Sequence, residues 1–260
     1  MHDRAPPLLV ICGPTAAGKT ALAAALADVV DLVVINADSR QIYRGFDIGT
    51  AKPTAAERDR VRHYCLDLAD PTERYTAYAW ASHAANAIDA AHRDGRVPVV
   101  VGGAGFYIRA LVHPLSASAP AGIERYVTQY LVVDPGAPLR ERIALRAARM
   151  LEGGWAEEVS SLAAVVPSEA PAWQASGYAA IRDHVAGTIS RAAAVDRVVI
   201  ATRQYAKRQR TWFRHQLPLD RTTRLDPDRA DAVRQAVAWV HAHGADARER
   251  SGLRRGEAGT

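Results

Sequence analysis

The chain has 260 residues, of which 48% are hydrophobic and 23% are charged, and its 33 Lys and Arg against 28 Asp and Glu give a net charge of +5. That balance is typical of a globular protein with a sizeable core, and it excludes a mainly disordered or fibrous chain. Apolar runs such as residues 97–101 are far too short to cross a bilayer, and no signal-peptide pattern opens the chain, so we expect a cytoplasmic protein without a membrane segment.

The first half of the chain alternates short apolar strands with helices. Apolar runs at residues 8–12, 32–36 and 97–101 predict buried strands, while helical patterns begin at Lys19 and span residues 78–92. Continuous apolar strands separated by helices indicate a parallel sheet that is covered on both faces. We therefore predict an α/β fold.

The second half of the chain is predicted to be mainly helical. A short linker within residues 115–128 leads to a strand at 130–133, and helices are then expected from Leu139 and over 189–215. Pro218 cannot continue the long helix and should end it.

A last amphipathic helix is predicted over residues 229–243, followed by a charged tail from Ala245 that we expect to be mobile. We accordingly predict a core at residues 1–218 and a C-terminal segment at 219–260. Cys12 and Cys65 show no metal-ligand spacing, and we expect both to be reduced thiols.

The octet GPTAAGKT fits the phosphate-binding loop pattern, and it stands between an apolar strand and a helix, as that loop requires. The free N–H groups and the positive dipole end of the helix would hold an anion. Lys19 would sit over the terminal phosphates and the Thr20 hydroxyl would coordinate Mg²⁺. The sheet should thus resemble that of the P-loop NTPases. The predicted phosphate-binding residues are Gly13, Pro14, Thr15, Ala16, Ala17, Gly18, Lys19 and Thr20.

A second glycine-rich turn, GGAG at residues 102–105, ends the strand at 97–101 and opens a helix over 106–112. It should lie at the same sheet edge as the first loop. An ATPase or GTPase of this kind usually carries an acid at such a strand end. Glycines stand there instead, and Asp38, after the strand at 32–36, is the carboxylate beside the loop. Asp38 is expected either to orient a metal or to act as a base.

Four motifs occur in order along residues 8–216. They are the phosphate loop, ADSRQIYRGFDIGTAKP at 37–53, VVGGAGFYIRAL at 100–111 and ATRQYAKRQRTWFR at 201–214. Together they closely resemble the tRNA dimethylallyltransferase family, whose members attach an isoprenoid group to N6 of the adenine next to the anticodon. The resemblance implies that the loop holds the diphosphate of dimethylallyl diphosphate rather than a nucleotide. It implies tRNA as the partner and would explain the missing hydrolytic acid.

The same resemblance implies roles for single residues. Asp38 matches the family's base, which accepts the N6 proton, and Thr15 matches a loop hydroxyl near the bridging oxygen. Arg142 matches an arginine facing the diphosphate, and with Lys19 and Mg²⁺ it would neutralise the leaving group. The residues implied to touch the extruded adenine and its neighbours are Asp38, Ser39, Arg40, Gln41 and Ala104.

The positive charge is concentrated in one segment, since residues 203–224 hold seven Lys or Arg against a single Asp. At helical spacing, four of these cations share one face, which suits an RNA phosphate backbone. These residues are Arg203, Lys207, Arg210 and Arg214.

Two departures from the family pattern stand out. Ala104 occupies a position where the family usually has Thr, and only a short segment at about 115–128 replaces several tens of helical residues that help to grip the anticodon stem. Three interpretations follow. A compact, monomeric tRNA dimethylallyltransferase is favoured, while a transferase acting on free adenine nucleotides and a catalytically poor RNA-binding protein are the alternatives.

Overall fold

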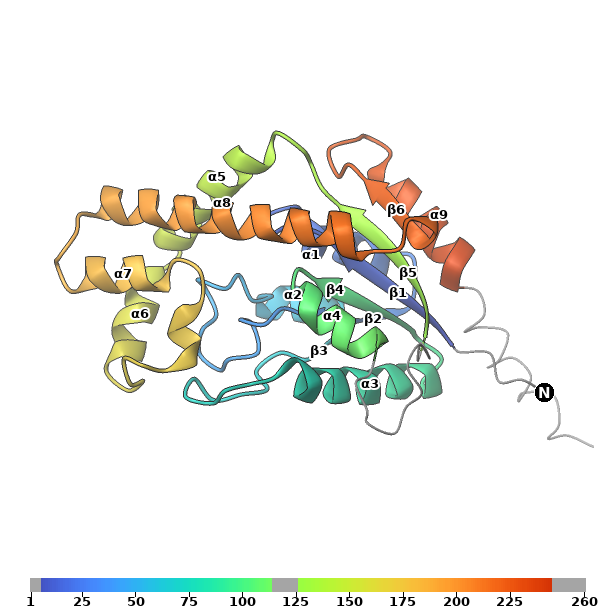
Figure 1. Ribbon diagram of the computed structural model, residues 1–260, viewed down its shortest axis with the longest axis horizontal. Helices are drawn as coiled ribbons and strands as arrows, with labels where there is room; N and C mark the ends of the chain where they lie inside the picture. Colours follow the sequence, from blue (N-terminus) through green and yellow to red (C-terminus); the bar gives the residue numbers. More distant parts are fainter. Residues whose placement is uncertain (1–5, 114–125, 245–260) are drawn as a thin grey trace, which may run out of the picture.

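The computed structural model describes residues 6–113 and 126–244, and their strands form one parallel sheet of six strands in the order β3-β2-β4-β1-β5-β6. Figure 1 shows the sheet between layers of helices, with the long helix α8 running across it. The strands are β1 (Pro7–Cys12), β2 (Leu32–Ala37), β3 (His63–Tyr64), β4 (Val97–Gly102), β5 (Val127–Val133) and β6 (Thr222–Leu225). The predicted α/β fold with a parallel sheet is confirmed.

The central strands are buried on both faces, because helices cover each side of the sheet. On one side lie α3 (Ala77–Arg93) and α4 (Gly105–Val112), and on the other lie α1 (Lys19–Ala27) and α9 (Ala232–Gly244). Alternate residues of β2 therefore belong to two separate cores, one beneath each helical layer.

The helices between β5 and β6 form the second part of the fold, with α6 and α7 at the left of Figure 1. The long helix α8 contacts α4, α5 and α7, so it links the helical part to the sheet. Ser190 caps its first turn by accepting a hydrogen bond from the Ala193 N–H at 3.2 Å, and the helix ends before Pro218. These helices are α5 (Leu139–Glu152), α6 (Trp155–Ala163), α7 (Tyr178–Val185) and α8 (Arg191–Gln216), with short 3-10 turns at Pro171–Gln174 and Leu219–Arg221.

Helix α7 and several shorter elements were not predicted from the sequence. Helix α2 (Ala55–Arg60) is a short helix of six residues, none of them buried, and it is stabilised by a capping box between Thr54 and Glu57. Strand β3 has two residues, and β6 has the sequence TTRL, which is too polar and too short to stand out.

Several predicted boundaries shift in the structure. Strand β5 begins at Val127, so the predicted short segment at 115–128 overlaps it, while residues 114–125 and the tail from Ala245 lie outside the described residues. Helix α9 begins at Ala232 rather than 229. The boundary predicted at residue 218 does not coincide with a break in the sheet, because β6 pairs with β5 and α9 packs against α1 and β1.

Cys12 and Cys65 are free and buried, and burial raises the pKa of each thiol to about 12. Both are therefore protonated at neutral pH, as expected for inert structural thiols. Across residues 6–113 and 126–244, no helix combines the length and apolar character needed to cross a membrane.

Candidate active site

The phosphate-binding loop joins β1 to α1 and lies directly against the end of β5. Gly13 has a φ of 145°, and a Cβ built there would meet the Val133 carbonyl oxygen at 2.2 Å, so only glycine fits. Gly18, at φ 95°, precedes the first turn of α1 in the left-handed region. The loop thus leads into the N-terminus of α1, where an anion can bind.

Lys19 folds back over the loop. Its Nζ donates hydrogen bonds to the carbonyl oxygens of Gly13 at 3.0 Å and Pro14 at 2.8 Å. Burial lowers the pKa of Lys19 to about 8, and the negative charge of the nearby Asp38 opposes that shift. Lys19 is therefore held beside the loop with a proton that a bound anion would stabilise.

An open cavity of about 1120 Å³ extends from this loop towards α5. Thr15, Lys19 and Thr20 line one side, and Asp38 lines the floor where β2 ends. The residues of the predicted loop and the predicted base are thus brought to one cavity at the same sheet edge.

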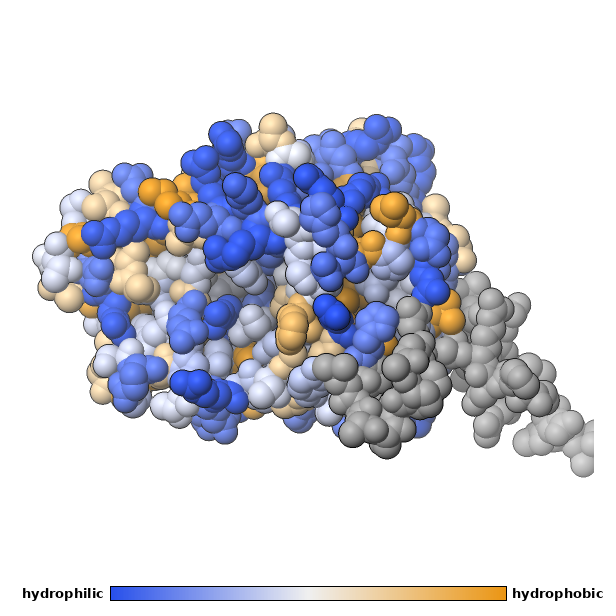
Figure 2. Space-filling view, in the orientation of Figure 1, coloured by the Kyte–Doolittle hydropathy of each residue, from blue (hydrophilic) through white to orange (hydrophobic). Residues whose placement is uncertain are grey.

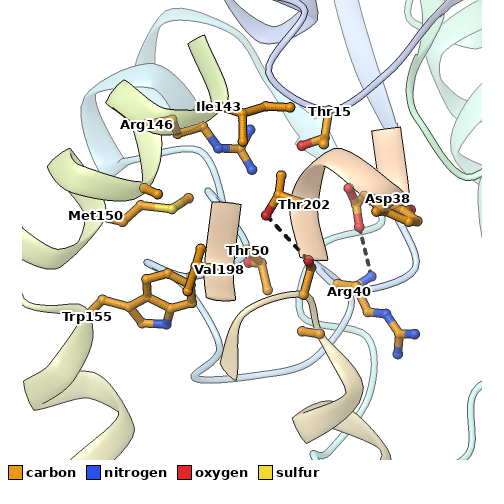
Figure 3. A pocket seen from close by; sticks show the side chains of 15 residues that line it. Thr15, Asp38, Arg40, Thr50, Ile143, Arg146, Met150, Trp155, Val198 and Thr202 are labelled. Atoms are coloured by element: carbon orange, nitrogen blue, oxygen red, sulfur yellow. Dashed lines mark hydrogen bonds between the residues drawn. The ribbon is translucent and has the colours of Figure 1, made fainter. Parts of the chain in front are cut away.

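Asp38 is oriented by the turn that follows it. Its Oδ1 accepts a hydrogen bond from the Arg40 N–H at 2.8 Å, which fixes the carboxylate relative to β2. Figure 3 shows Asp38, Thr15 and Thr202 gathered around one space. A carboxylate and a hydroxyl are therefore available to a substrate placed between them.

A narrower cavity of about 50 Å³ opens beside Asp38 and shares Thr15, Asp38 and Arg146 with the larger one. Its far wall is apolar (Figure 3). That wall is formed by Ile143, Ala147, Met150, Trp155 and Val198. The space suits a small hydrocarbon group next to an anion-binding loop.

Two arginines of α5 face the loop, and only one was predicted. Arg142 donates to the Ala17 carbonyl oxygen at 3.3 Å and also pairs with Asp228, so its charge is partly engaged within the protein. Arg146, four residues later on the same helix face, lines both cavities (Figure 3). Burial lowers the pKa of Arg146, and the Asp38 charge opposes this. The spacing of four from Arg142 was the signal available for Arg146.

The residues after Asp38 differ in burial, and the buried Gln41 also lines the large cavity. Ser39 and Arg40 are half-buried, and Arg40 lines the narrow cavity. Gln41 is buried, and its Nε2 donates to the carbonyl oxygens of Thr50 and Ala51, both at 2.9 Å. Gln41 therefore supports the backbone of the DIGTAKP segment, and its contact with RNA stays a prediction.

Ala104 caps α4 from a buried position. Its N–H donates to the Ala37 carbonyl oxygen at 3.0 Å, and the residue is 9% exposed. Ala104 lines neither cavity described above. Its predicted contact with the adenine is untested.

Gln209 is a site residue that the sequence patterns did not single out. It is 5% exposed, and its Oε1 accepts from the Thr15 N–H at 2.8 Å while its Nε2 donates to the Gly103 carbonyl oxygen at 2.9 Å. A glutamine on the apolar face of an otherwise basic helix was the available signal.

The basic stripe of α8 consists of three exposed cations rather than four. Arg203, Lys207 and Arg214 are exposed. Arg210 instead forms a two-pronged ion pair with Asp134, with its Nε 2.8 Å from Oδ2, and also donates to the Gly136 carbonyl oxygen at 2.6 Å. Arg210 therefore ties α8 to the end of β5, although it also lines the groove beside Arg203 and Lys207, and its predicted contact with an RNA phosphate stays a prediction.

Arg140 of α5 extends the exposed stripe. It lines a groove of about 460 Å³ together with Arg203 and Lys207. Figure 2 shows predominantly hydrophilic residues along α8. We call Arg140, Arg203, Lys207 and Arg214 the basic face.

Comparison with known proteins shows which family the chain resembles. The model of the family described as IPP transferase matches residues 41–129 and 117–216, which together make up more than half of the chain. The tRNA dimethylallyltransferase of a Cyanothece species is 36% identical, over 80% of this chain and 89% of that protein. The enzyme of that name from Deinococcus radiodurans is 34% identical, over 88% and 95%. This chain belongs to the IPP transferase family.

Solved structures of the IPP transferase family share the fold. The tRNA isopentenylpyrophosphate transferase of Bacillus halodurans superposes with a TM-score of 0.80 at 26% identity, covering 95% of this chain and 99% of that chain. A eukaryotic dimethylallyltransferase acting on tRNA gives a TM-score of 0.82 at 23% identity, which bears on the fold alone. The Cyanothece alignment extends over 271 residues yet covers 80% of this 260-residue chain, so that relative carries residues this chain lacks.

The lowered pKa of Lys19 predicts a pH dependence of anion binding. Below about pH 8 Lys19 is protonated and attracts the anion, and above it that attraction is lost, at up to about tenfold in affinity per pH unit. We expect the affinity for inorganic pyrophosphate at fixed Mg²⁺, measured by calorimetry, to fall as the pH rises through 8. Lys19→Met should lack this fall, and the same pH profile in both proteins would contradict the assignment.

Proposed function

We propose that this protein transfers a dimethylallyl group from dimethylallyl diphosphate to N6 of the adenine next to the anticodon in tRNA, and releases diphosphate. The observation that carries the proposal is the convergence of the phosphate loop, Asp38 and Thr15 on one cavity beside an apolar wall. The names of the relatives support tRNA as the acceptor.

The reaction needs stabilisation of the leaving diphosphate and a base that accepts the N6 proton. The bond between C1 of the prenyl group and the bridging oxygen breaks, and a bond between C1 and N6 forms. The loop amides, Lys19 and Arg146 stabilise the negative charge that builds up on the diphosphate. Asp38 accepts the proton that leaves N6, which is a poor nucleophile while it remains neutral.

Mg²⁺ fits the donor set at the loop. Thr20 stands exposed at the first turn of α1 and lines the large cavity. Within the described residues there is no group of three or more His, Cys, Asp or Glu that could hold a metal alone. Thr20 would therefore hold the ion together with diphosphate oxygens and water, as is usual for Mg²⁺. When bound, the ion supplies further charge neutralisation on the leaving diphosphate.

The basic face supports the binding of an RNA backbone. Its cations project from α8 and α5 on the outside of the helices that line the cavity. Phosphate contacts of this kind fix the register of the RNA, while contacts at the cavity select the base. This protein is proposed to act as a monomer.

Substitutions on α8 should separate RNA contacts from structural ones. Lys207→Ala should raise the KM for tRNA without changing the KM for the prenyl donor, and should lower the log–log salt slope of RNA binding by about 0.7 to 0.9. Arg210→Ala should instead lower the free energy of unfolding by about 1 kcal/mol, and with it the Tm, because Asp134 loses its ion-pair partner. Salt titrations of both variants with an anticodon stem-loop, alongside thermal melts, test this. An unchanged slope for Lys207→Ala would remove it from the RNA surface.

The deciding experiment offers two acceptors together. Labelled dimethylallyl diphosphate is incubated with the protein, an anticodon stem-loop and AMP, and the products are separated by mass. We expect the label on the adenine next to the anticodon. Label chiefly on AMP would replace the proposal with the free-nucleotide activity, and label on neither would leave a protein that only binds RNA.

A further inference from the structure

Gln209 joins the two glycine-rich segments of the active site. From one buried side chain, Oε1 accepts the Thr15 N–H of the phosphate loop and Nε2 donates to the Gly103 carbonyl oxygen of the second turn. The approach is tight, because a Cβ built on Gly103 would lie 2.2 Å from Gln209 Nε2. The side chain therefore bridges two segments just beyond the last paired residues of β1 and β4, Cys12 and Gly102.

The Thr15 N–H has an unusual partner for its location. Amides of a phosphate-binding loop ordinarily point at the anion. Here the Thr15 N–H is instead directed at Gln209 of α8. Fixing this amide also fixes the Thr15 side chain, which stands beside Asp38 in the cavity (Figure 3).

The opposite side of α8 carries three of the four residues of the basic face, Arg203, Lys207 and Arg214. Lys207 is exposed two residues before Gln209, and Arg210, the next residue, is tied to Asp134. A helix with its side chains is about 10 Å across, so an RNA phosphate on the outside and the Thr15 N–H on the inside are held by one rigid element.

We propose that Gln209 is a positioning residue that holds Thr15 and the second glycine-rich turn in register with the RNA-binding helix. Its effect on the loop stands on the hydrogen bonds alone, and its effect on transfer rests on the proposed function. Without Gln209 the Thr15 N–H and the Gly103 carbonyl would lose their partners, and the loop would sample other positions.

Amide exchange tests the loop without any substrate. In Gln209→Met, which keeps the length and removes both hydrogen bonds, the Thr15 amide should exchange with deuterium at least tenfold faster than in the unaltered protein, measured by NMR. Amides in β1 and β4 should keep their rates. Gln216→Met, an exposed glutamine at the end of the same helix, is the control and should leave the Thr15 amide protected.

Kinetics then separate positioning from folding. Gln209→Met should lower kcat for transfer to an anticodon stem-loop at least tenfold while the KM for the stem-loop stays within twofold, because the basic face is intact. Gln209→Glu retains the acceptor for Thr15 and should restore Thr15 protection but not the bond to Gly103. Unchanged Thr15 exchange in Gln209→Met, or exchange that is raised throughout β1 and β4, would overturn the proposal. If the unaltered protein transfers nothing, the proposed function fails, but the exchange result still decides the role of Gln209 at the loop.

Discussion

Asp38→Asn is expected to bind the prenyl donor normally and to lose most of its turnover. The substitution keeps the size of the side chain and an oxygen that can accept from the Arg40 N–H, so the turn after β2 should survive. It removes the group that takes the N6 proton, and loss of a positioned base typically costs a factor of about 10² to 10⁴. Single-turnover rates with saturating donor and stem-loop measure this loss.

The control for this variant is Asp59→Asn, an exposed aspartate in α2. It should transfer at the normal rate. Inorganic pyrophosphate should bind Asp38→Asn at least as tightly as the unaltered protein, because a negative charge near the loop has been removed. Near-normal single-turnover rates in Asp38→Asn would exclude Asp38 as the base.

Lys19→Ala is expected to weaken both donor binding and transfer. The ammonium is held at the loop by two carbonyl oxygens, where a leaving diphosphate would gain charge. Removing one such stabilising group costs roughly 3 kcal/mol in the transition state, or about 10² to 10³ in rate. Steady-state kinetics with varied dimethylallyl diphosphate should show a lower kcat and a higher KM for the donor, so that kcat/KM falls by more than kcat.

ATP distinguishes this assignment from an ordinary nucleotide hydrolase. Since β4 ends in glycine rather than an acid, ATP should compete poorly with the prenyl donor and should release no phosphate steadily. Lys52→Ala is an unsuitable control, because Lys52 is buried between Asp47 and Asp67. Lys207→Ala keeps the loop intact and should retain the donor KM that Lys19→Ala loses.

Local patterns predicted the parts of the site that local chemistry determines. The loop residues follow from an octet whose glycines and lysine have fixed geometric duties, and Asp38 follows from its place after an apolar strand. Both lie within a few residues of the strands that position them. Asp38 and five of the eight loop residues line one cavity, namely Thr15, Ala16, Gly18, Lys19 and Thr20 of the loop.

Residues whose duties depend on distant partners were harder to predict. Arg210 looked like one of four equivalent cations, and its partner Asp134 lies 76 positions earlier. Gln209 bonds to Thr15 across 194 positions. No periodicity in the sequence encodes such pairs, because they form only when α8 packs over the sheet. Arg146 escaped for another reason, since an arginine on an amphipathic helix is most often a solvent-facing residue.

The position of α8 and β6 late in the chain bears on the order in which the protein matures. The Thr15 N–H can bond to Gln209, and β5 can pair with β6, only after the chain has emerged beyond residue 225 during synthesis. The phosphate-binding loop therefore cannot take its final shape before then. Contacts of such long sequence separation form slowly. Until β6 is made, β5 is an unpaired edge strand of the sheet, and such an edge can pair with the wrong strand during synthesis. Competence to bind the donor therefore follows the emergence of Gln209 and β6.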